Sequence, residues 1–299
     1  MRKEAGTMKK IGFIGVGIMG KSMVRNLMKA GFELHIYARA KSKVEDVIEE
    51  GAIFHESIGD CVKGCDAVIT IVGYPADVEE VYFEEGNILD SAEEGTYLID
   101  MTTTSPMLAE KIYEKGTTKG FHVLDAPVTG GDTGAREGTL SILVGGTQED
   151  YESCMPLFEA MGTNINYQGG PGSGQHCKMA NQIMIAGTLS GVCEALTYAN
   201  AKGLDLSTVL KSVSTGAAGS RQLDIFGPKI LEGDYAPGFF MKHFIKDMKL
   251  ALTEANLSGL SLEVLSQALA NYEELESEGY GNLGTQALIK HYEESCGEE

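Results

Sequence analysis

The segment KIGFIGVGIMGKSMVRNLMKAG, residues 10–31, decides the fold of the first half of the chain. Its apolar run at 10–14 predicts a β-strand, and the apolar spacing over 18–30 predicts an amphipathic helix. The turn between them, GVGIMG at 15–20, has the G-x-G-x-x-G spacing. That spacing is a weak signal alone, but between a strand and a helix it predicts that N–H groups at the helix start bind the diphosphate of a dinucleotide. The turn residues expected to contact such a cofactor are Gly15, Gly17, Ile18, Met19 and Gly20.

Strand-like and helix-like stretches alternate after this turn. Further strands are predicted at 33–38, 66–72, 96–100, 121–126 and 140–146. Helices are predicted between most of them, notably at 41–50, 76–84 and 105–119. Because a strand, a helix and another strand in succession need a crossover connection, the sheet is expected to be mainly parallel. The first half is therefore predicted to be an α/β Rossmann domain with a doubly wound sheet.

The pattern changes at YQGGPGSG (167–174), a Gly- and Pro-rich segment that precedes a long helical stretch at about 175–202. No strand-like run follows it. Further helices are predicted at 205–215, 219–226, 242–258, 261–277 and 283–294. We therefore expect an all-α domain, joined to the first domain by a long interdomain helix. The expected division is 1–170 for dinucleotide binding and 171–299 for substrate binding and oligomerisation.

The chain carries a formal net charge of −19, from 43 acidic and 24 basic side chains. A field of this sign repels nucleic acid and anionic lipid, so neither is an expected partner. It also repels anionic cofactors and acid substrates, so a site for them needs local positive charge. Lysines and arginines in Gly-rich surroundings are therefore the candidate binding residues.

Cysteine usage and hydropathy suggest a cytoplasmic protein without a metal site. The six cysteines form no CxxC pair and have no histidine at zinc-ligand spacing. No signal peptide is expected, and residues 1–7 are predicted to be a loose extension. The long helix is not expected to span a membrane because Lys178, Asn181, Gln182 and Glu194 interrupt its apolar run. A helix that is apolar nearly all round is usually buried between domains or subunits, which predicts a homodimer or homotetramer.

The end of the second predicted strand bears on the choice of nicotinamide cofactor. NAD-binding domains typically place Asp or Glu about 20 residues after the glycines, where it bonds the ribose 2′-hydroxyl. Here the stretch YARAKSK (37–43) has no carboxylate but three cations and a hydroxyl. The guanidinium of Arg39 can bond a 2′-phosphate through two N–H groups and stack on adenine. We expect NADP(H) to be preferred, with NAD(H) as the second candidate, although Lys43 alone also fits the solvated start of a helix.

Three further segments combine polar residues with glycine or with a helix start. They are DAPVTGG (125–131), GSGQHCKMANQ (172–182) and KDMKLAL (246–252). With GVGIMG, and in this order and spacing, they make the chain resemble the β-hydroxyacid dehydrogenase family over almost its whole length. Members of that family include 3-hydroxyisobutyrate dehydrogenase, tartronate semialdehyde reductase and glyoxylate/succinic semialdehyde reductases.

The resemblance implies roles for individual residues. It implies that Lys178 is the catalytic residue, a general acid/base. The residues implied to contact the substrate are Thr129, Gly130, Gly131 and Asn181. The residues implied to lie along the cofactor are Val72, Gly73, Thr103 and Lys246. The implied reaction interconverts a small 3-hydroxy acid, or another short hydroxy acid, and its semialdehyde or oxo acid.

Two positions bear on how this chain differs within the family. The family usually reads DAPVSGG, and Thr129 here replaces the serine. The hydroxyl is kept, but the added methyl group narrows the pocket and so bears on substrate size. NAD-using members often carry Asp near position 38, where this chain has Ala38, in agreement with the expected NADP(H) preference.

The chemistry requires residues of these types. Oxidation of an alcohol needs a base that accepts the hydroxyl proton as hydride leaves carbon, and reduction needs an acid that returns it. A free lysine titrates at about 10.4, so burial or a neighbouring cation such as Lys246 has to lower the pKa of Lys178. Asn181 lies three residues from Lys178 and shares its helix face. N–H groups of a Gly-Gly turn, as at 130–131, suit a carboxylate.

Other interpretations of these residues stay open. A lone helical lysine is ordinarily a solvated surface residue, and the chain would then be a non-catalytic NADP-binding protein. An imine reductase shares the architecture but generally lacks a lysine at the position of Lys178. A phosphosugar dehydrogenase is set aside, because it would need a longer helical domain and more cations than the short, acidic second half provides. Asp247 can orient Lys246 or cap its helix, whereas Cys61 and Cys65 are expected to be small core residues rather than a redox pair.

Overall fold

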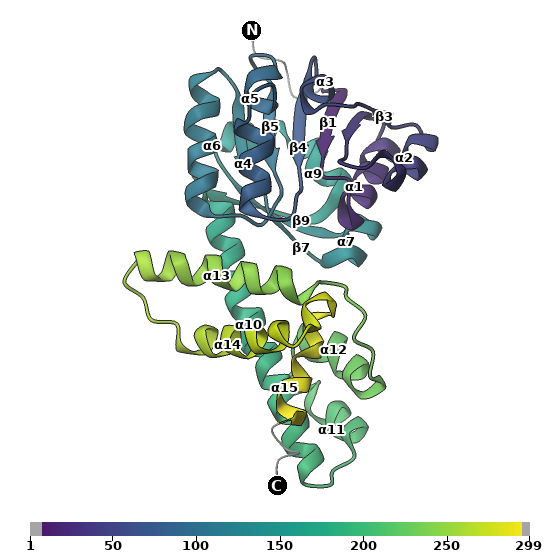
Figure 1. Ribbon diagram of the computed structural model, residues 1–299, viewed down its shortest axis with the longest axis vertical. Coiled ribbons are helices and arrows are strands. Elements are labelled where there is room, and N and C mark those ends of the chain that lie inside the picture. The colour runs from purple at the N-terminus through teal and green to yellow at the C-terminus, as the bar shows by residue number, and fades with distance from the viewer. Residues whose placement is uncertain (1–7, 295–299) are drawn as a thin grey trace. The chain divides into compact units, whose positions relative to one another are not determined.

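Figure 1 shows the structure of the protein, a computed structural model that describes residues 8–294. The chain forms two compact units, of which the first ends at Lys178 and the second begins at Met179. Each unit has a hydrophobic core of its own. The extension predicted at 1–7 and the cysteine at 296 lie outside the described residues.

The first unit is built on one sheet with the strand order β3-β2-β1-β4-β5-β6-β8-β7, and β9 pairs with β8. The strands are β1 (Lys10–Ile14), β2 (Glu33–Tyr37), β3 (Ile53–Phe54), β4 (Ala67–Thr70), β5 (Tyr97–Asp100), β6 (His122–Asp125), β7 (Val128–Thr129), β8 (Leu140–Gly145) and β9 (Gly162–Gly169). Neighbours from β3 to β6 are parallel, whereas β8 is antiparallel to β6 and β7. The strand order reverses beside β1, and such a switch point is where doubly wound sheets bind ligands.

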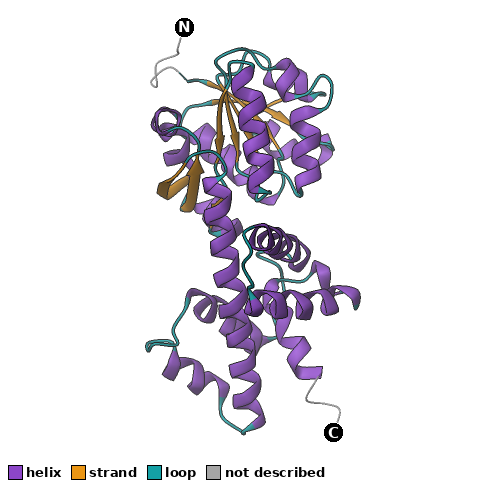
Figure 2. Ribbon diagram, turned by 90° about the vertical axis from the view of Figure 1, so that its left-hand side faces the viewer, coloured by secondary structure: helices purple, strands orange, loops and turns teal. Residues whose placement is uncertain are grey.

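Two layers of helices cover the sheet (Figure 2), and the side chains of its strands alternate between the two cores beneath them. In β4, Ile69 belongs to the core shared with α1 and α9, while Val68 belongs to the core shared with α4 and α6. This alternation follows from the two-residue period of a strand. The helices of this unit are α1 (Ile18–Lys29), η1 (Lys41–Lys43), α2 (Glu45–Glu49), α3 (Ile58–Val62), α4 (Pro75–Phe83), α5 (Ile88–Ser91), α6 (Pro106–Thr118), α7 (Gly131–Glu137), α8 (Gln148–Ser153) and α9 (Met155–Met161). The predicted Rossmann fold is confirmed.

Three strands of this sheet escaped prediction. β3 and β7 have two residues each, which is too short for a periodic pattern to show. β9 is longer, but most of its residues are exposed or half-buried, and its register on β8 shifts twice. A strand at the edge of a sheet buries little, so its sequence carries no apolar alternation. The segment that the sequence suggested as the start of a linker therefore still belongs partly to the sheet.

The second unit is helical. Helix α10 (Ser173–Ala201) begins in the first unit and continues into the second. The others are α11 (Leu206–Val213), α12 (Arg221–Glu232), α13 (Met241–Leu257), α14 (Glu263–Ser277), η2 (Tyr280–Asn282), η3 (Thr285–Leu288) and α15 (Ile289–Glu294). Between residues 179 and 294 the structure has no β-strand, only an isolated bridge from Phe240 to Gly284. The all-α prediction is confirmed.

Helix α12 is longer than predicted. The sequence suggested an end at 226, before the Gly-Pro pair, but the helix continues to Glu232 with Pro228 inside it. It ends where Gly233 adopts a left-handed conformation.

None of the helices within residues 8–294 combines the length and apolar character that a membrane crossing needs.

Candidate active site

The turn between β1 and α1 is shaped by its glycines. Gly15 has φ +96°, and a Cβ there would overlap the carbonyl oxygen of Ile71. A Cβ on Gly20 would overlap the carbonyl oxygen of Gly15. Gly17, at the N-cap of α1, faces open space, and no side chain caps the helix. The first N–H groups of α1 are thus accessible to an anion, and the close packing leaves room only for glycine at the other two positions.

Two further loops follow β4 and β5 at the same edge of the sheet. The N–H of Val72 donates to Oγ1 of Thr102 at 3.0 Å. The N–H of Thr102 in turn donates to Oδ1 of Asp100 at 3.1 Å. Gly73 follows Val72 directly, and Thr103 is half-buried beside Thr102. The structure therefore joins the loops that carry the predicted cofactor contacts by hydrogen bonds through Thr102.

The DAPVTGG segment lies at the carboxyl end of β6. Thr129 pairs with Ser141 in the ladder between β7 and β8 and is half-buried. Gly130 (φ +129°) and Gly131 (φ +65°) adopt backbone conformations that other residues rarely adopt, and Gly130 is the N-cap of α7. A helix start formed by two glycines presents its N–H groups without side-chain obstruction, which suits a carboxylate ligand.

The start of α10 is bonded to the first unit's loops. Both carboxylate oxygens of Asp125 accept backbone N–H groups, from Gly172 and from Gln175, each at 2.8 Å. The fully buried side chain of Gln175 donates to the carbonyl of Thr102 at 2.7 Å and accepts the N–H of Thr104 at 3.0 Å. Lys178 lies three residues beyond Gln175 on the same helix face and is only 6% exposed. Its turn of helix is therefore bonded to the loop after β5.

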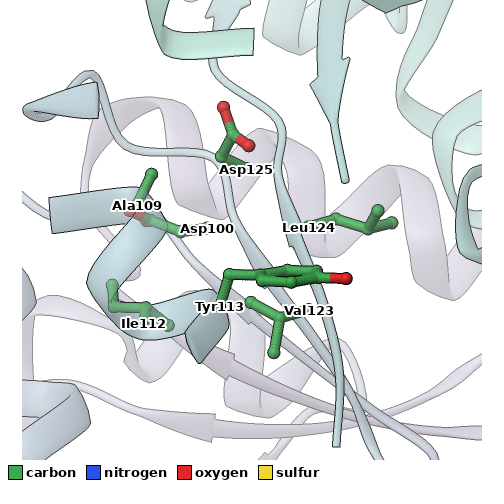
Figure 3. A pocket seen from close by; sticks show the side chains of 7 residues that line it. All are labelled: Asp100, Ala109, Ile112, Tyr113, Val123, Leu124 and Asp125. Carbon is green, nitrogen blue, oxygen red and sulfur yellow. The ribbon is translucent and has the colours of Figure 1, made fainter. Parts of the chain in front are cut away.

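The buried carboxylates beneath these loops have perturbed acidities. Burial raises the pKa of Asp100 to about 6 and also raises the pKa of Asp125. Within the described residues, Oδ2 of Asp100 has no hydrogen-bond partner. Asp100, Asp125 and Tyr113 are among the residues that line a small cavity (Figure 3). Its volume is about 10 Å³, about what one water molecule needs.

A group of four residues linked by hydrogen bonds and one ion pair lies in the second unit. Asn181 donates to the side-chain oxygen of Gln182 at 2.7 Å, and Gln182 donates to Oδ2 of Asp247 at 2.6 Å. The ammonium of Lys246 lies 2.8 Å from the other Asp247 oxygen. Asp247 is 1% exposed and stands in the interior of α13, so it orients Lys246 and does not cap the helix.

Arg39 follows β2, as the sequence suggested, and its side chain lies beside two carboxylates. Its guanidinium contacts Asp77, and it lies 3.1 Å from Glu80, both of α4. The Arg39 side chain is nevertheless 65% exposed. Close by in sequence, the ammonium of Lys41 lies over the ring of Phe54 at 5.1 Å. The end of β2 therefore combines the expected cations with two acidic side chains from elsewhere in the chain.

Comparisons with known proteins agree with this arrangement. Residues 10–170 match the NAD-binding domain of 6-phosphogluconate dehydrogenase, and residues 172–292 match the NAD-binding family model of NADP-dependent 3-hydroxyisobutyrate dehydrogenase. An uncharacterised oxidoreductase of Bacillus subtilis is 52% identical over 94% of this chain and 98% of its own length. The 2-hydroxy-3-oxopropionate reductase of Escherichia coli is 36% identical over 95% of this chain and 97% of its own. The chain belongs to the β-hydroxyacid dehydrogenase family.

A solved member of this family has the same fold. The structure of 3-hydroxyisobutyrate dehydrogenase from Mycobacterium tuberculosis with L-serine is 26% identical, and its TM-score is 0.88 over 95% of this chain and 99% of that one. The protein is thus an NAD(P)-dependent oxidoreductase of the hydroxyacid dehydrogenase type.

The residues that the sequence assigned to cofactor and substrate binding lie in both units of the chain. The glycine turn, the loop residues and Lys178 lie in the first unit, whereas Asn181 and Lys246 lie in the second. Sequence reasoning missed the buried polar residues Gln175 and Asp100 and the acidic partner Asp77. Gln175 stands inside the motif GSGQHCKMANQ (172–182), three residues before Lys178, and this helical spacing was the available signal.

The cysteines of this family member near the sheet are buried thiols. Cys61 is fully buried, and burial raises its pKa to about 12. Cys65 donates to the carbonyl of Cys61 at 3.2 Å. A thiol with so high a pKa stays protonated and unreactive at neutral pH. No cluster of three or more His, Cys, Asp or Glu side chains suited to a metal ion occurs within the described part of the chain.

Proposed function

We propose that the chain is an NADP(H)-dependent oxidoreductase that interconverts a small 3-hydroxy acid, or another short hydroxy acid, and its semialdehyde or oxo acid, with Lys178 as general acid/base. The position of Lys178 carries the proposal. Its amine is buried near the start of α10. Asp125, at the end of β6, accepts the N–H of Gln175 in this turn of helix, and the Gln175 side chain bonds the loop after β5. A buried lysine near a nucleotide-binding edge is the kind of group whose acidity can be tuned for proton transfer.

The glycine turn fits a dinucleotide. At Gly15 and Gly20 a Cβ would overlap backbone atoms, while Gly17 faces open space at an uncapped helix start. When bound, the nicotinamide cofactor supplies or accepts the hydride. The chain's part is to bind the diphosphate at the N–H groups of α1, and to place Val72, Gly73 and Thr103 along the cofactor.

The preference for NADP(H) over NAD(H) rests on the end of β2. Arg39 and Lys41 supply positive charge there, and the residues from 37 to 43 include no carboxylate. The description of the family model matched by residues 172–292 names an NADP-dependent enzyme, which supports the same choice. NAD(H) is the second cofactor of the proposal.

The substrate is proposed to be a small aldehyde acid such as succinic semialdehyde, glyoxylate or tartronate semialdehyde. The N–H groups at Gly130 and Gly131 and the hydroxyl of Thr129 would bind its carboxylate. Lys178 would exchange a proton with the substrate oxygen, and Asn181, three residues along the helix, would bond the substrate. The relative from Escherichia coli, a 2-hydroxy-3-oxopropionate reductase, supports this substrate class.

Lys178→Arg tests the acid/base role, because arginine keeps the charge but does not titrate near neutral pH. With NADPH or NADH and a panel of small aldehyde acids, we expect the variant to lose about 10²- to 10⁴-fold in kcat. NADPH affinity, measured by fluorescence titration, should stay within about twofold because Lys178 is not assigned to cofactor binding. Lys202→Arg, at an exposed lysine just after α10, is the matched control. Equal kcat values for Lys178→Arg and the wild type would refute the acid/base assignment.

The assembly, the location and the domain division are also part of the proposal. Met184 and Tyr198 of α10 are each 65% exposed, which supports a homodimer or homotetramer formed through this helix. A division at residue 170 is supported by the family models, which meet between 170 and 172. A cytoplasmic location stays a prediction.

A further inference from the structure

Arg39 contacts two carboxylates that come from the far side of the glycine turn. Strands β2 and β4 are the two neighbours of β1, which carries that turn. Arg39 follows β2, and α4, with Asp77 and Glu80, follows β4. The guanidinium donates to Oδ1 of Asp77 and to Oε2 of Glu80 at 3.1 Å. Two acidic side chains thus lie beside the cation assigned to the cofactor's 2′-phosphate.

The two partners in this contact differ in exposure and in their other hydrogen bonds. Asp77 is 19% exposed, and its second oxygen accepts the N–H of Tyr74 at 2.9 Å in the capping box of α4. Its carboxylate is therefore held in place by the helix that it caps. The Arg39 side chain is long and 65% exposed, so it can rotate away. Both carboxylates contact Nη2 of Arg39, so a phosphate that binds through Arg39 has to share the guanidinium with them or displace them.

Asp77 and Glu80 offset the positive charge that Arg39 offers to a phosphate. Arg39 contributes one positive charge, and Asp77 and Glu80 contribute two negative charges. A phosphate monoester carries about −1.5 to −2 at pH 7. The ribose 2′-hydroxyl of NAD(H) is uncharged and meets no such repulsion. By occupying Arg39, the carboxylates therefore disfavour the cofactor that carries a 2′-phosphate and leave the other unaffected.

We propose that Asp77 is a specificity-determining residue for the cofactor, which holds Arg39 and so limits the preference for NADP(H) over NAD(H). The inference rests on the proposed function, in which Arg39 binds the 2′-phosphate. Glu80 acts in the same direction but more weakly, because its side chain is 44% exposed and its contact is longer. Asp77 is a positioning residue in this role, since it acts through Arg39.

The test measures two fragments of the cofactors by isothermal titration calorimetry on the full-length protein. The fragments are adenosine 2′,5′-bisphosphate, which carries the 2′-phosphate, and AMP, which lacks it. In Asp77→Asn the ratio of the two affinities should shift toward the bisphosphate by about fivefold, or about 1 kcal/mol. Asparagine keeps an oxygen that can accept the Tyr74 N–H, so α4 should stay capped. Glu80→Gln, which caps nothing, should shift the ratio in the same direction by about twofold.

Two controls separate this effect from a general loss of negative charge. Glu79→Gln removes the same charge from the same helix, but Glu79 pairs with Lys111 at 2.8 Å, so the ratio should not change. In an Arg39→Ala background, Asp77→Asn should change the ratio by less than about twofold, because there is no guanidinium to release.

The possible results separate the inference from the function on which it rests. A wild type that binds both fragments equally would overturn the proposed NADP(H) preference, and a gain of preference in Asp77→Asn would still support the role of Asp77. An unchanged or lowered ratio in Asp77→Asn, with unfolding temperature retained, would overturn the inference. A full shift that persists without Arg39 would overturn it as well.

Discussion

At the scale of single residues, Asp100 is a carboxylic acid in an environment that disfavours its ionised form. Thr70 donates to Oδ1 at 2.8 Å and the N–H of Thr102 donates to the same oxygen, but Oδ2 has no partner in residues 8–294. Burial is the main cause that raises its pKa from 3.8 to about 6. The folded protein therefore binds more protons here than the unfolded chain at pH values between these two.

Asp100 should make the protein less stable as the pH rises through this window. Its contribution is largest below 3.8 and is lost as the pH approaches about 6. Asp100→Asn cannot titrate and should remove this slope. The difference in free energy of unfolding between wild type and variant, measured in urea, should fall by about 2 kcal/mol between about pH 4.5 and about pH 7.5.

Asp90→Asn is the contrasting control for this measurement. The hydrogen bond from Lys119 is the main cause that lowers the pKa of Asp90 below 3.8. Stability that depends on Asp90 is therefore lost only as the pH falls through that range, which lies below the measured window. Parallel pH profiles for the wild type and Asp100→Asn would show that the carboxyl group is not perturbed.

At the scale of elements, the junction between α10 and the sheet depends on a few buried hydrogen bonds. Gln175 bonds both to the carbonyl of Thr102 and to the N–H of Thr104. Its side chain thus satisfies one carbonyl and one N–H of the loop after β5, as a neighbouring strand would do in a sheet. Because Lys178 stands one turn further along α10, the same bonds set the position of the proposed acid/base.

Gln175→Ala should both destabilise the first unit and reduce turnover. The substitution leaves a buried donor and a buried acceptor without partners, which costs about 2 to 4 kcal/mol in free energy of unfolding. Since Lys178 loses its fixed position, kcat should fall more than the affinity for NADPH. Gln148→Ala, at an exposed position of α8, should change stability by less than about 0.5 kcal/mol. Urea unfolding and steady-state kinetics check both effects, and an unchanged stability in Gln175→Ala would contradict the role of the bonds.

At the scale of the whole molecule, the exposed face of α10 is the signal for assembly. Met184 and Tyr198 lie fourteen residues apart, so they share a face, and each is 65% exposed. Large apolar side chains repeated along one helix face usually mark an interface.

Met184→Glu combined with Tyr198→Glu should reduce the oligomeric mass in solution. A charge buried in an apolar interface has to be desolvated without compensation, so association should weaken by about 100-fold or more. Multi-angle light scattering after size exclusion gives the mass directly. Met107→Glu, at a 58% exposed position of α6, should leave the mass unchanged. A wild type that is monomeric, or a double variant with the wild-type mass, would exclude an interface through this face.

The sequence alone indicated most of the architecture and the motifs that carry chemistry. Strand β1 was predictable because both of its faces are buried, which gives an unbroken apolar run, and helix α6 because one buried face leaves a helical period in its sequence. The glycine turn was also readable, since a strand, three spaced glycines and a helix follow one another within 20 residues or so. The exposed edge strand and the short strands could not be predicted, because β9 is largely exposed and β3 has only two residues.

Tertiary structure decided which distant side chains meet. Arg39 and Asp77 are 38 residues apart, and Gln175 and the carbonyl of Thr102 are 73 apart. Local periodicity records which face of an element is buried, but it says nothing of which polar group lies opposite. That choice depends on the strand order and on the loops at the carboxyl ends of β2, β4 and β5. The acidic partners of Arg39 and the hydrogen bonds at the start of α10 therefore emerged only from the folded chain.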